Sequence, residues 1–166
     1  MHGTPELRPT PDRVRETLFN WLAPVIEGAA CLDCFAGTGA LGFEALSRGA
    51  GSVVMLESDR SLVQALKEQS AILEAGGARI VHADALSWLD ANRERFDIIF
   101  VDPPFASDLA RQACAGILNW GHLAPGGLVY VESARGWEPP PGCAIRKQGK
   151  AGQVQYMLLA EDKGGG

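Results

Sequence analysis

The sequence has few of the residues that mark membrane, disulfide-rich or metal-binding proteins. No apolar run approaches the roughly 20 residues that a membrane-spanning helix needs, and the opening MHGTPELRPT lacks the apolar stretch of a signal peptide. The 166 residues include four cysteines and three histidines. Cys31 and Cys34 form a C-x-x-C pair, but no second pair follows at zinc spacing, so packing is favoured over a metal or redox role. We expect a cytoplasmic protein with reduced thiols and no bound metal.

An excess of positive charge is also missing. The chain has 15 Lys and Arg residues against 20 Asp and Glu residues, a net charge of −5, whereas nucleic-acid-binding domains usually carry a basic patch. The acidity is concentrated in residues 31–108, which hold 12 acids and 6 bases, while residues 109–166 hold 6 bases and 4 acids. Composition alone therefore gives no sign of a nucleic-acid partner.

Alternating apolar runs and helical patterns from residue 31 onward predict βαβ units with a parallel sheet. The pattern predicts strands at 31–36, 52–57, 78–83, 96–101 and 128–132. It predicts helices at 40–48, 59–75, 85–92 and 107–120. In the helix at 59–75, the spacing of Leu62, Leu66, Gln69 and Leu73 predicts one inward face.

The two ends of the chain add a helix and a hairpin. Thr10 and Pro11 form a helix start, with Thr as N-cap and Pro at the first helical position. Strands at 144–147 and 154–160, joined by a turn at 149–152, predict an antiparallel hairpin. We expect one domain over residues 1–166, made of a helical segment (1–30), a βα core (31–133), the hairpin (144–161) and a tail (162–166).

A glycine-rich turn lies between the first expected strand and helix. Gly37, Gly39 and Gly42 form G-x-G-x-x-G, and Glu57 closes the second strand 20 residues after Gly37, where a carboxylate can accept both ribose hydroxyls. This pattern fits a dinucleotide site and an S-adenosylmethionine site equally well. A turn required only for packing is the simpler alternative.

Two acidic positions favour S-adenosylmethionine over a dinucleotide. Asp33 lies four residues before Gly37, where its carboxylate would repel a pyrophosphate and attract a cationic amino group. Asp102-Pro103-Pro104-Phe105 follows the apolar strand at 96–101, next to the first strand in a doubly wound sheet. Because prolines fix φ and remove N–H donors, this segment presents acceptors, which suit a substrate with an exocyclic amine.

These motifs resemble those of S-adenosylmethionine-dependent amino-methyltransferases: DCFAGTGALG, Glu57, the HADA step at 82–85 and DPPF. The segment RPTPDRVRETLFNWL at 8–22 narrows the resemblance to the bacterial 16S rRNA guanine-N2 methyltransferases of the RsmD family, over Leu7 to about Ala160. The resemblance implies a Rossmann-like α/β fold with a seven-stranded sheet and a C-terminal antiparallel hairpin.

DPPF occurs in adenine and guanine enzymes alike, so methylation of adenine N6 stays an alternative. An NAD(P)-dependent oxidoreductase and a non-catalytic cofactor-binding or RNA-binding module also stay open as functions.

The resemblance also implies roles for individual residues. The residues expected to bind S-adenosyl-L-methionine are Asp33, Phe35, Gly37, Thr38 and Gly39 around its methionine part, Glu57 at the ribose, and Asp84 and Ala85 at the adenine. The residues of the expected catalytic segment are Asp102 and the Pro103 carbonyl, which accept hydrogens from the target amine, Pro104, and Phe105, which stacks on the base. Helix capping is the alternative role for Glu57 and Asp84, and packing is the alternative for Phe105.

The implied partner is 16S rRNA or the assembling 30S subunit, bound by a monomer without a membrane or metal. Members of the family carry a basic β-rich extension before the RPT segment, whereas seven residues precede Arg8 here. Either this chain is a shortened form or RNA binding relies on other surfaces. The candidates for contacts to phosphate are the basic residues near the two ends: Arg8, Arg13, Arg15, Arg146, Lys147 and Lys150. For each one alone, an ordinary solvated charge is an equally good interpretation, and Arg13 and Arg15 gain weight from their place in the family segment.

Overall fold

The computed structural model describes residues 12–104 and 108–162. The expected helix start at Thr10 and Pro11 lies outside these residues. The elements in chain order are α1 (Asp12–Leu22), β1 (Ala30–Asp33), α2 (Ala40–Ser47), β2 (Ser52–Glu57), α3 (Arg60–Ile72), β3 (Ala78–His82), α4 (Ala85–Ala91), β4 (Phe96–Val101), α5 (Leu109–Asn119), β5 (Leu123–Ala134), β6 (Cys143–Ala151) and β7 (Val154–Glu161).

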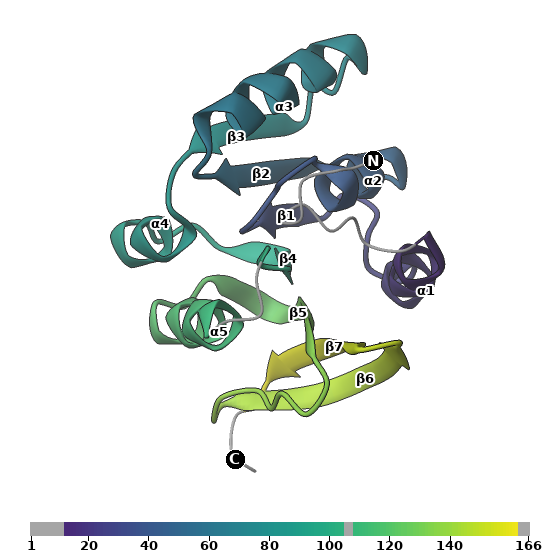
Figure 1. Ribbon diagram of the computed structural model, residues 1–166, viewed down its shortest axis with the longest axis vertical. Helices are drawn as coiled ribbons and strands as arrows, with labels where there is room; N and C mark the ends of the chain where they lie inside the picture. Colours follow the sequence, from purple (N-terminus) through teal and green to yellow (C-terminus); the bar gives the residue numbers. More distant parts are fainter. Residues whose placement is uncertain (1–11, 105–107, 163–166) are drawn as a thin grey trace.

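The strands form one seven-stranded sheet in the order β3-β2-β1-β4-β5-β7-β6 (Figure 1). Strands β1 to β5 run parallel to their neighbours, and β7 pairs antiparallel with both β5 and β6. The order reverses between β1 and β4, and ligands of doubly wound sheets bind at the carboxyl ends of the strands at such a point. The expected α/β fold with a C-terminal hairpin is confirmed.

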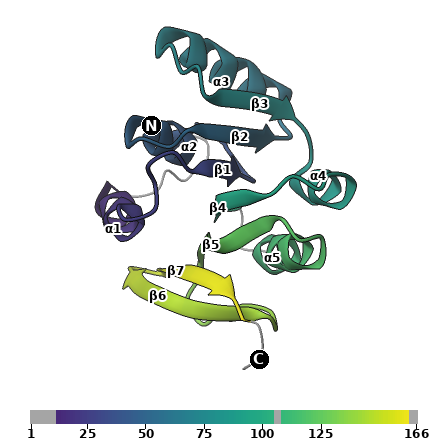
Figure 2. The same ribbon diagram turned by 180° about the vertical axis from the view of Figure 1, so that it is seen from behind.

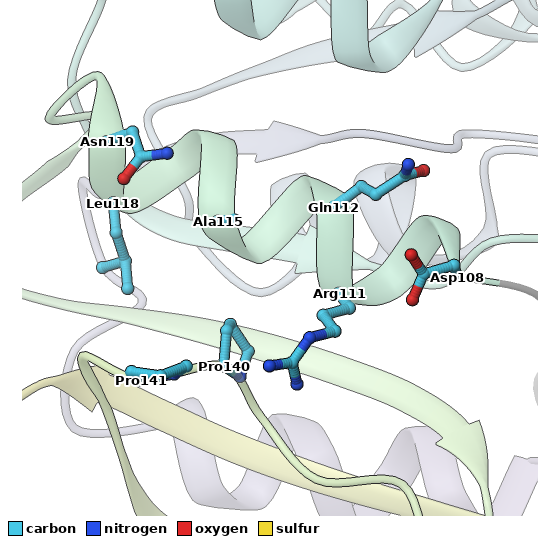
Figure 3. A pocket seen from close by; sticks show the side chains of 8 residues that line it. All are labelled: Asp108, Arg111, Gln112, Ala115, Leu118, Asn119, Pro140 and Pro141. Atoms are coloured by element: carbon cyan, nitrogen blue, oxygen red, sulfur yellow. The ribbon is translucent and has the colours of Figure 1, made fainter.

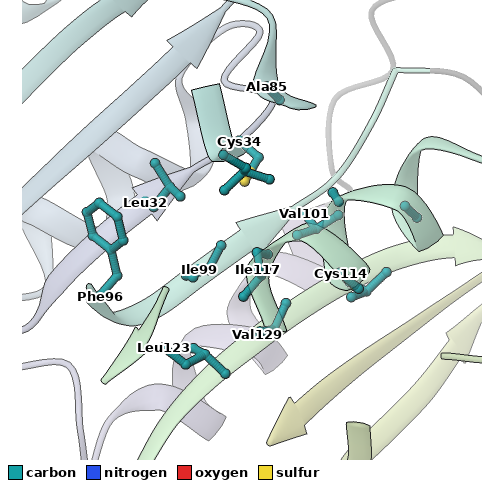
Figure 4. Close-up of a cluster of buried hydrophobic side chains, with 14 of the residues drawn as sticks. Leu32, Cys34, Ala85, Phe96, Ile99, Val101, Cys114, Ile117, Leu123 and Val129 are labelled. Carbon is teal, nitrogen blue, oxygen red and sulfur yellow. The ribbon is translucent and has the colours of Figure 1, made fainter. Parts of the chain in front are cut away.

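Helices cover both faces of the sheet. Figures 1 and 2 show α1, α2 and α3 on one face and α4 and α5 on the other, which we call the α1 face and the α5 face. Side chains alternate along each strand: Phe100 of β4 packs under α1, and Val101 packs under α5 in the cluster of Figure 4. Burial on both faces explains why the central strands are apolar without interruption. Among the described residues, no helix is both long and apolar enough to span a membrane.

The structure corrects the expected inner face of the helix at 59–75. Helix α3 ends at Ile72, and its buried residues are Val63 and Leu66. Gln69 is exposed and Leu73 is 50% exposed. Helix α3 covers the outer strands β2 and β3, so its last turn has little of the sheet left to cover. The helical spacing was predicted, but the length of contact with the sheet was not.

The expected bounds of three strands are also wrong. Strand β1 ends at Asp33 rather than at residue 36, because the chain turns into the glycine-rich loop. Strand β5 begins at Leu123 and includes the Pro-Gly-Gly at 125–127, where its pairing with β4 is irregular. Strand β6 continues to Ala151, so residues 149–151 of the expected turn pair with β7 and only Gly152 lies in the turn. At Gly149 the Tyr156 ring occupies the place of a Cβ, 2.6 Å away, so this glycine serves packing rather than a turn.

Candidate cofactor and substrate site

The glycine-rich loop has its glycines for two physical reasons. Gly39 starts α2 with φ of 84°, and a Cβ there would lie 2.4 Å from the Phe43 ring. Gly42 lies inside α2, where a Cβ would meet the Cε of Met55 at 2.2 Å. The first glycine allows the left-handed turn and the second allows the helix to approach β2 closely. The loop therefore brings the N-terminus of α2 to the end of β1.

Glu57 ties this loop to the end of β2. Its Oε1 accepts a hydrogen bond from the Gly37 N–H at 2.8 Å, and its Oε2 accepts one from the Asp59 N–H at 3.0 Å. The N-cap of α3 is Asp59, which accepts from the Ser61 N–H at 2.8 Å. Helix capping is therefore wrong as the role of Glu57. A carboxylate has about four lone-pair sites, so both oxygens of Glu57 retain capacity for ribose hydroxyls.

Asp33 is the most unusual polar residue of the site. It is 1% exposed at the end of β1, and its Oδ1 has no hydrogen-bond partner. Burial raises the pKa of this carboxyl from 3.8 to about 7, although the N–H groups of Phe35 and Gly42 favour its charged form. An isolated buried carboxylate is costly unless a cation pairs with it. This atom therefore fits the cationic amino group of S-adenosylmethionine.

Asp84 and Ala85 lie where β3 passes into α4. The exposed Asp84 is the N-cap of α4, and its Oδ2 accepts from the Ser87 N–H at 3.0 Å. The capping alternative is confirmed for Asp84, and Ala85 is buried in the first turn. One carboxylate oxygen caps the helix, so a contact of the other with adenine stays compatible with the cap. Among the remaining expected cofactor residues, Phe35 is half-buried and Thr38 is exposed.

The Asp-Pro-Pro segment follows β4 directly, beside β1 at the point where the strand order reverses. Asp102 and Pro104 are half-buried and Pro103 is buried, while Phe105 lies outside the described residues. Burial raises the pKa of Tyr130 on β5, with smaller contributions from the charges of Glu132 and Asp102. The structure thus brings Asp102 to the same edge of the sheet as Asp33 and Glu57.

Four acids form a row along this edge, one from each of four neighbouring strands: Glu57 (β2), Asp33 (β1), Asp102 (after β4) and Glu132 (β5). The residue two positions before each acid packs on the α1 face. Because side chains two residues apart in a strand point to the same face, all four acids are directed toward the α1 face. Sequence reasoning gave Glu132 no role. The signal was available, because LVYVE ends in an acid as SVVMLE does.

The cysteines do not add a reactive group to this site. Burial raises the pKa of the Cys31 thiol to about 12, with smaller contributions from the charges of Asp97 and Asp33. Burial also raises the pKa of Cys34 well above its usual value. Both side chains therefore stay protonated at neutral pH, and a protonated thiol is a poor nucleophile and metal ligand. Within the described ranges, no group of three or more His, Cys, Asp or Glu side chains could hold a metal.

A cavity of about 400 Å³ lies elsewhere, between α5 and the proline segment that precedes β6 (Figure 3). Arg111 of α5 extends toward Pro140 there, and its guanidinium donates to the Glu138 carbonyl at 3.4 Å. None of the residues expected to bind cofactor or substrate lines this cavity. The row of acids, rather than this cavity, is therefore the candidate site.

Of the basic residues expected to bind RNA, Arg8 lies outside the described residues and the others lie on α1 and β6. Arg13 of α1 is exposed, whereas Arg15 pairs with Asp12 at 2.8 Å. Arg146 and Lys147 are exposed on the edge strand β6. Helix α1 and the hairpin are neighbours, because the rings of Trp21 and Tyr156 lie 5.5 Å apart.

Comparison with known proteins agrees with the motifs and the fold. Residues 1–160 match the family described as conserved hypothetical protein 95. Ribosomal RNA small subunit methyltransferase D of Escherichia coli K12 is 47% identical over 98% of this chain and 83% of its own length, and its Haemophilus influenzae namesake is 42% identical over 92% and 82%. The solved structure of Escherichia coli yhhF has a TM-score of 0.87 at 48% identity, covering 94% of this chain and 88% of its own. The chain belongs to the family of ribosomal RNA small subunit methyltransferase D.

Proposed function

We propose that this chain transfers a methyl group from S-adenosyl-L-methionine to the exocyclic N2 amine of a guanine in 16S rRNA. The observation that carries the proposal is the buried, unpartnered Oδ1 of Asp33, with Asp102 at the end of the neighbouring strand β4. Its relatives support the substrate class, because they are named as methyltransferases of small-subunit ribosomal RNA.

The residues of the loop fit the cofactor part by part. Asp33 would bind the amino group, Glu57 would hold the ribose hydroxyls, and Asp84 would accept from the adenine amine. The backbone of the loop from Phe35 to Gly39 would surround the methionine part. A dinucleotide fits less well, because its pyrophosphate would lie against the buried carboxylate of Asp33.

The chemistry requires mainly alignment of the target amine. The lone pair of guanine N2 is conjugated into the ring and is a poor nucleophile, while S-adenosylmethionine supplies a sulfonium methyl group that is an activated electrophile. Asp102 and the Pro103 carbonyl would accept the two amine hydrogens and stabilise the positive charge that develops on nitrogen. Holding the amine in line contributes about 7–11 kcal/mol to lowering the barrier. The proton then leaves to Asp102 or to water.

The remaining predicted site residues would contact the RNA, at the target base and at its phosphates. Phe105 would stack on the extruded base and offset part of the few kcal/mol, roughly, that unstacking costs. Arg13, Arg146 and Lys147 would contact phosphates. The substrate would be 16S rRNA or the assembling 30S subunit in the cytoplasm, modified by a monomer.

Two experiments test the function. Calorimetry should show binding of S-adenosylhomocysteine and no comparable binding of NAD. Transfer of tritiated methyl to 30S particles and to free 16S rRNA should occur, and mass spectrometry of the nucleosides should give N2-methylguanosine. Binding without transfer to either RNA would contradict the proposal and support a non-catalytic module, and N6-methyladenosine would show the wrong base.

The variant Asp102→Asn tests the assigned amine acceptor. It should lower kcat by about 100-fold or more, because one charged group that stabilises the transition state becomes neutral. Its affinity for S-adenosylhomocysteine should remain that of the unaltered chain. Asp108→Asn is the matched control, because Asp108 is the next acid along the chain, is exposed and makes no side-chain cap to α5. Equal activity of the two variants would remove Asp102 from its role.

A further inference from the structure

We propose that Glu132 determines the base specificity of this site by accepting the N1–H of the target guanine beside Asp102. The inference rests on the proposed function and deepens it, since it names the residue that recognises guanine. Guanine presents two adjacent donors on one edge, the N2 amine and N1–H. Two carboxylates on neighbouring strands, Asp102 directly after β4 and Glu132 beside it within β5, match that pair of donors.

The strand register places Glu132 next to Asp102. Val101 of β4 pairs with Val131 of β5, so the following residues of these parallel strands are cross-strand neighbours. Neighbouring strands lie about 4.8 Å apart, a spacing that lets two side chains reach adjacent atoms of one base. Glu132 is the outermost acid of the row on the substrate side, since Asp33 and Glu57 lie on the cofactor side of Asp102.

A hydrogen bond from Tyr130, two residues earlier on the same strand, orients the Glu132 carboxylate. The Tyr130 hydroxyl donates to its Oε2 at 2.9 Å, and both side chains are buried, at 6% and 0% exposed. Burial, together with the charges of Glu132 and Asp102, raises the pKa of Tyr130, so its hydroxyl remains a donor. The bond from Tyr130 fixes one oxygen of a carboxylate that has about four lone-pair sites in all.

With this assignment, each of the four acids in the row has a hydrogen-bond donor of the cofactor or the substrate as its partner. The buried Asp33 with its unpartnered Oδ1 independently marks the edge as a place where a ligand brings donors. Along the sheet, Glu57 would face ribose hydroxyls, Asp33 an ammonium group, Asp102 an amine and Glu132 a ring N–H. Each acid would therefore receive a hydrogen-bond donor from cofactor or substrate.

The same geometry explains discrimination against adenine. Adenine presents its N6 amine next to N1, which has a lone pair in place of a hydrogen. With its amine on Asp102, adenine would direct that lone pair at the Glu132 carboxylate. A buried acceptor facing another acceptor is left without its hydrogen bond, which disfavours binding. The DPPF segment alone does not separate the two bases, and Glu132 supplies the difference.

The variant Glu132→Gln tests this assignment with a base analogue. The target nucleotide is first mapped, and 16S rRNA fragments carrying guanine or 2-aminopurine at that position are reconstituted into 30S particles. 2-Aminopurine keeps the amine but has an N1 lone pair. The unaltered chain should prefer guanine, with kcat/KM for 2-aminopurine lower by at least about tenfold. In the variant this preference should shrink by about tenfold or reverse, because the amide N–H can donate to N1.

Controls separate recognition from folding and from the proposed function itself. The Gln side chain still accepts from Tyr130, so thermal stability and affinity for S-adenosylhomocysteine should not change. Glu138→Gln, at an exposed acid after β5, should keep the original preference. A variant Glu132→Gln with the preference of the unaltered chain would overturn the inference. Failure of the unaltered chain to methylate guanine N2 would instead contradict the proposed function.

Discussion

At the residue scale, Asp33 connects cofactor binding with pH. Its pKa is about 7 in the folded chain, compared with 3.8 as the ordinary value. Between these pH values the folded chain holds a proton that the unfolded chain has released. The free energy of unfolding therefore falls as pH rises from about 4 to about 7. The cofactor's amino group would offset this loss by pairing with the charged carboxylate.

The variant Asp33→Asn removes this titrating group. We expect the free energy of unfolding of the unaltered chain to fall, relative to the variant, by on the order of a few kcal/mol between pH 4 and pH 7. Urea denaturation at a series of pH values measures the difference. At pH 8 the variant should bind S-adenosylhomocysteine at least about tenfold more weakly, because the charged partner of the amino group is gone.

Asp90→Asn is the control for the pH series, because Asp90 is an exposed carboxyl on α4. Its stability should follow that of the unaltered chain at every pH. Binding of S-adenosylhomocysteine to the unaltered chain should strengthen as pH rises through 7, with release of a proton. Parallel stability curves for Asp33→Asn and the unaltered chain would show that Asp33 does not titrate in this range.

At the scale of elements, α3 and α4 begin in the same way after neighbouring strands. Asp59 caps α3 through the N–H groups of Ser61 and Leu62, and Asp84 caps α4 through that of Ser87. The Ser61 hydroxyl, followed by these N–H groups, favours the charged form of Asp59 and lowers its pKa. Both residues cap a helix, but only Asp84 is also assigned to the adenine of the cofactor. Asp59 therefore serves as the control for Asp84, because it is a cap without an expected role in binding.

Replacing each cap by Ala separates the structural role from the binding role. Asp84→Ala should lower the free energy of unfolding by about 1 kcal/mol, the usual cost of losing an N-cap. Asp59→Ala should change stability in the same direction. Only Asp84→Ala should also weaken binding of S-adenosylhomocysteine, by about tenfold if the adenine amine loses its acceptor. Equal affinities of the two variants in calorimetry would leave Asp84 with capping alone.

Apolar runs predict the bounds of the buried strands, but they do not predict contacts across strands. Strands β2 and β4 have the bounds that their apolar runs predict, because both are buried on two faces. The turn expected at 149–152 was wrong because the place of Tyr156 across the hairpin is a tertiary fact. The acids that end β1 and β2 and the acid directly after β4 were predicted as site residues from local motifs. The acid that ends LVYVE was a local signal for Glu132, but its place beside Asp102 depends on the pairing of β4 with β5, which local spacing does not reveal.

At the scale of the whole molecule, the net charge of −5 is compatible with an RNA substrate once the charges are placed. Negative side chains line the carboxyl edge of the sheet, where donors from cofactor and base are expected. Arg13 and Lys147 belong to α1 and to the strand at the β6 edge. Lys147 pairs with Leu158, which packs on the α1 face, so both cations lie on one side of the sheet. RNA that reaches the acids from this side would meet cations first.

The double variant Arg13→Ala, Lys147→Ala tests whether these cations bind phosphate. Removal of each phosphate contact should reduce the slope of log affinity against log salt concentration by about 0.7–0.9 and weaken binding at low salt. Filter binding of 16S rRNA over a range of KCl concentrations measures both.

The control is Lys67→Ala, since Lys67 is exposed on α3 beside the opposite edge strand β3. Because the cofactor site does not include these residues, affinity for S-adenosylhomocysteine should be the same in all three proteins. A salt slope equal to that of the unaltered chain would show that α1 and β6 carry ordinary solvated charges and that RNA reaches the site from another side.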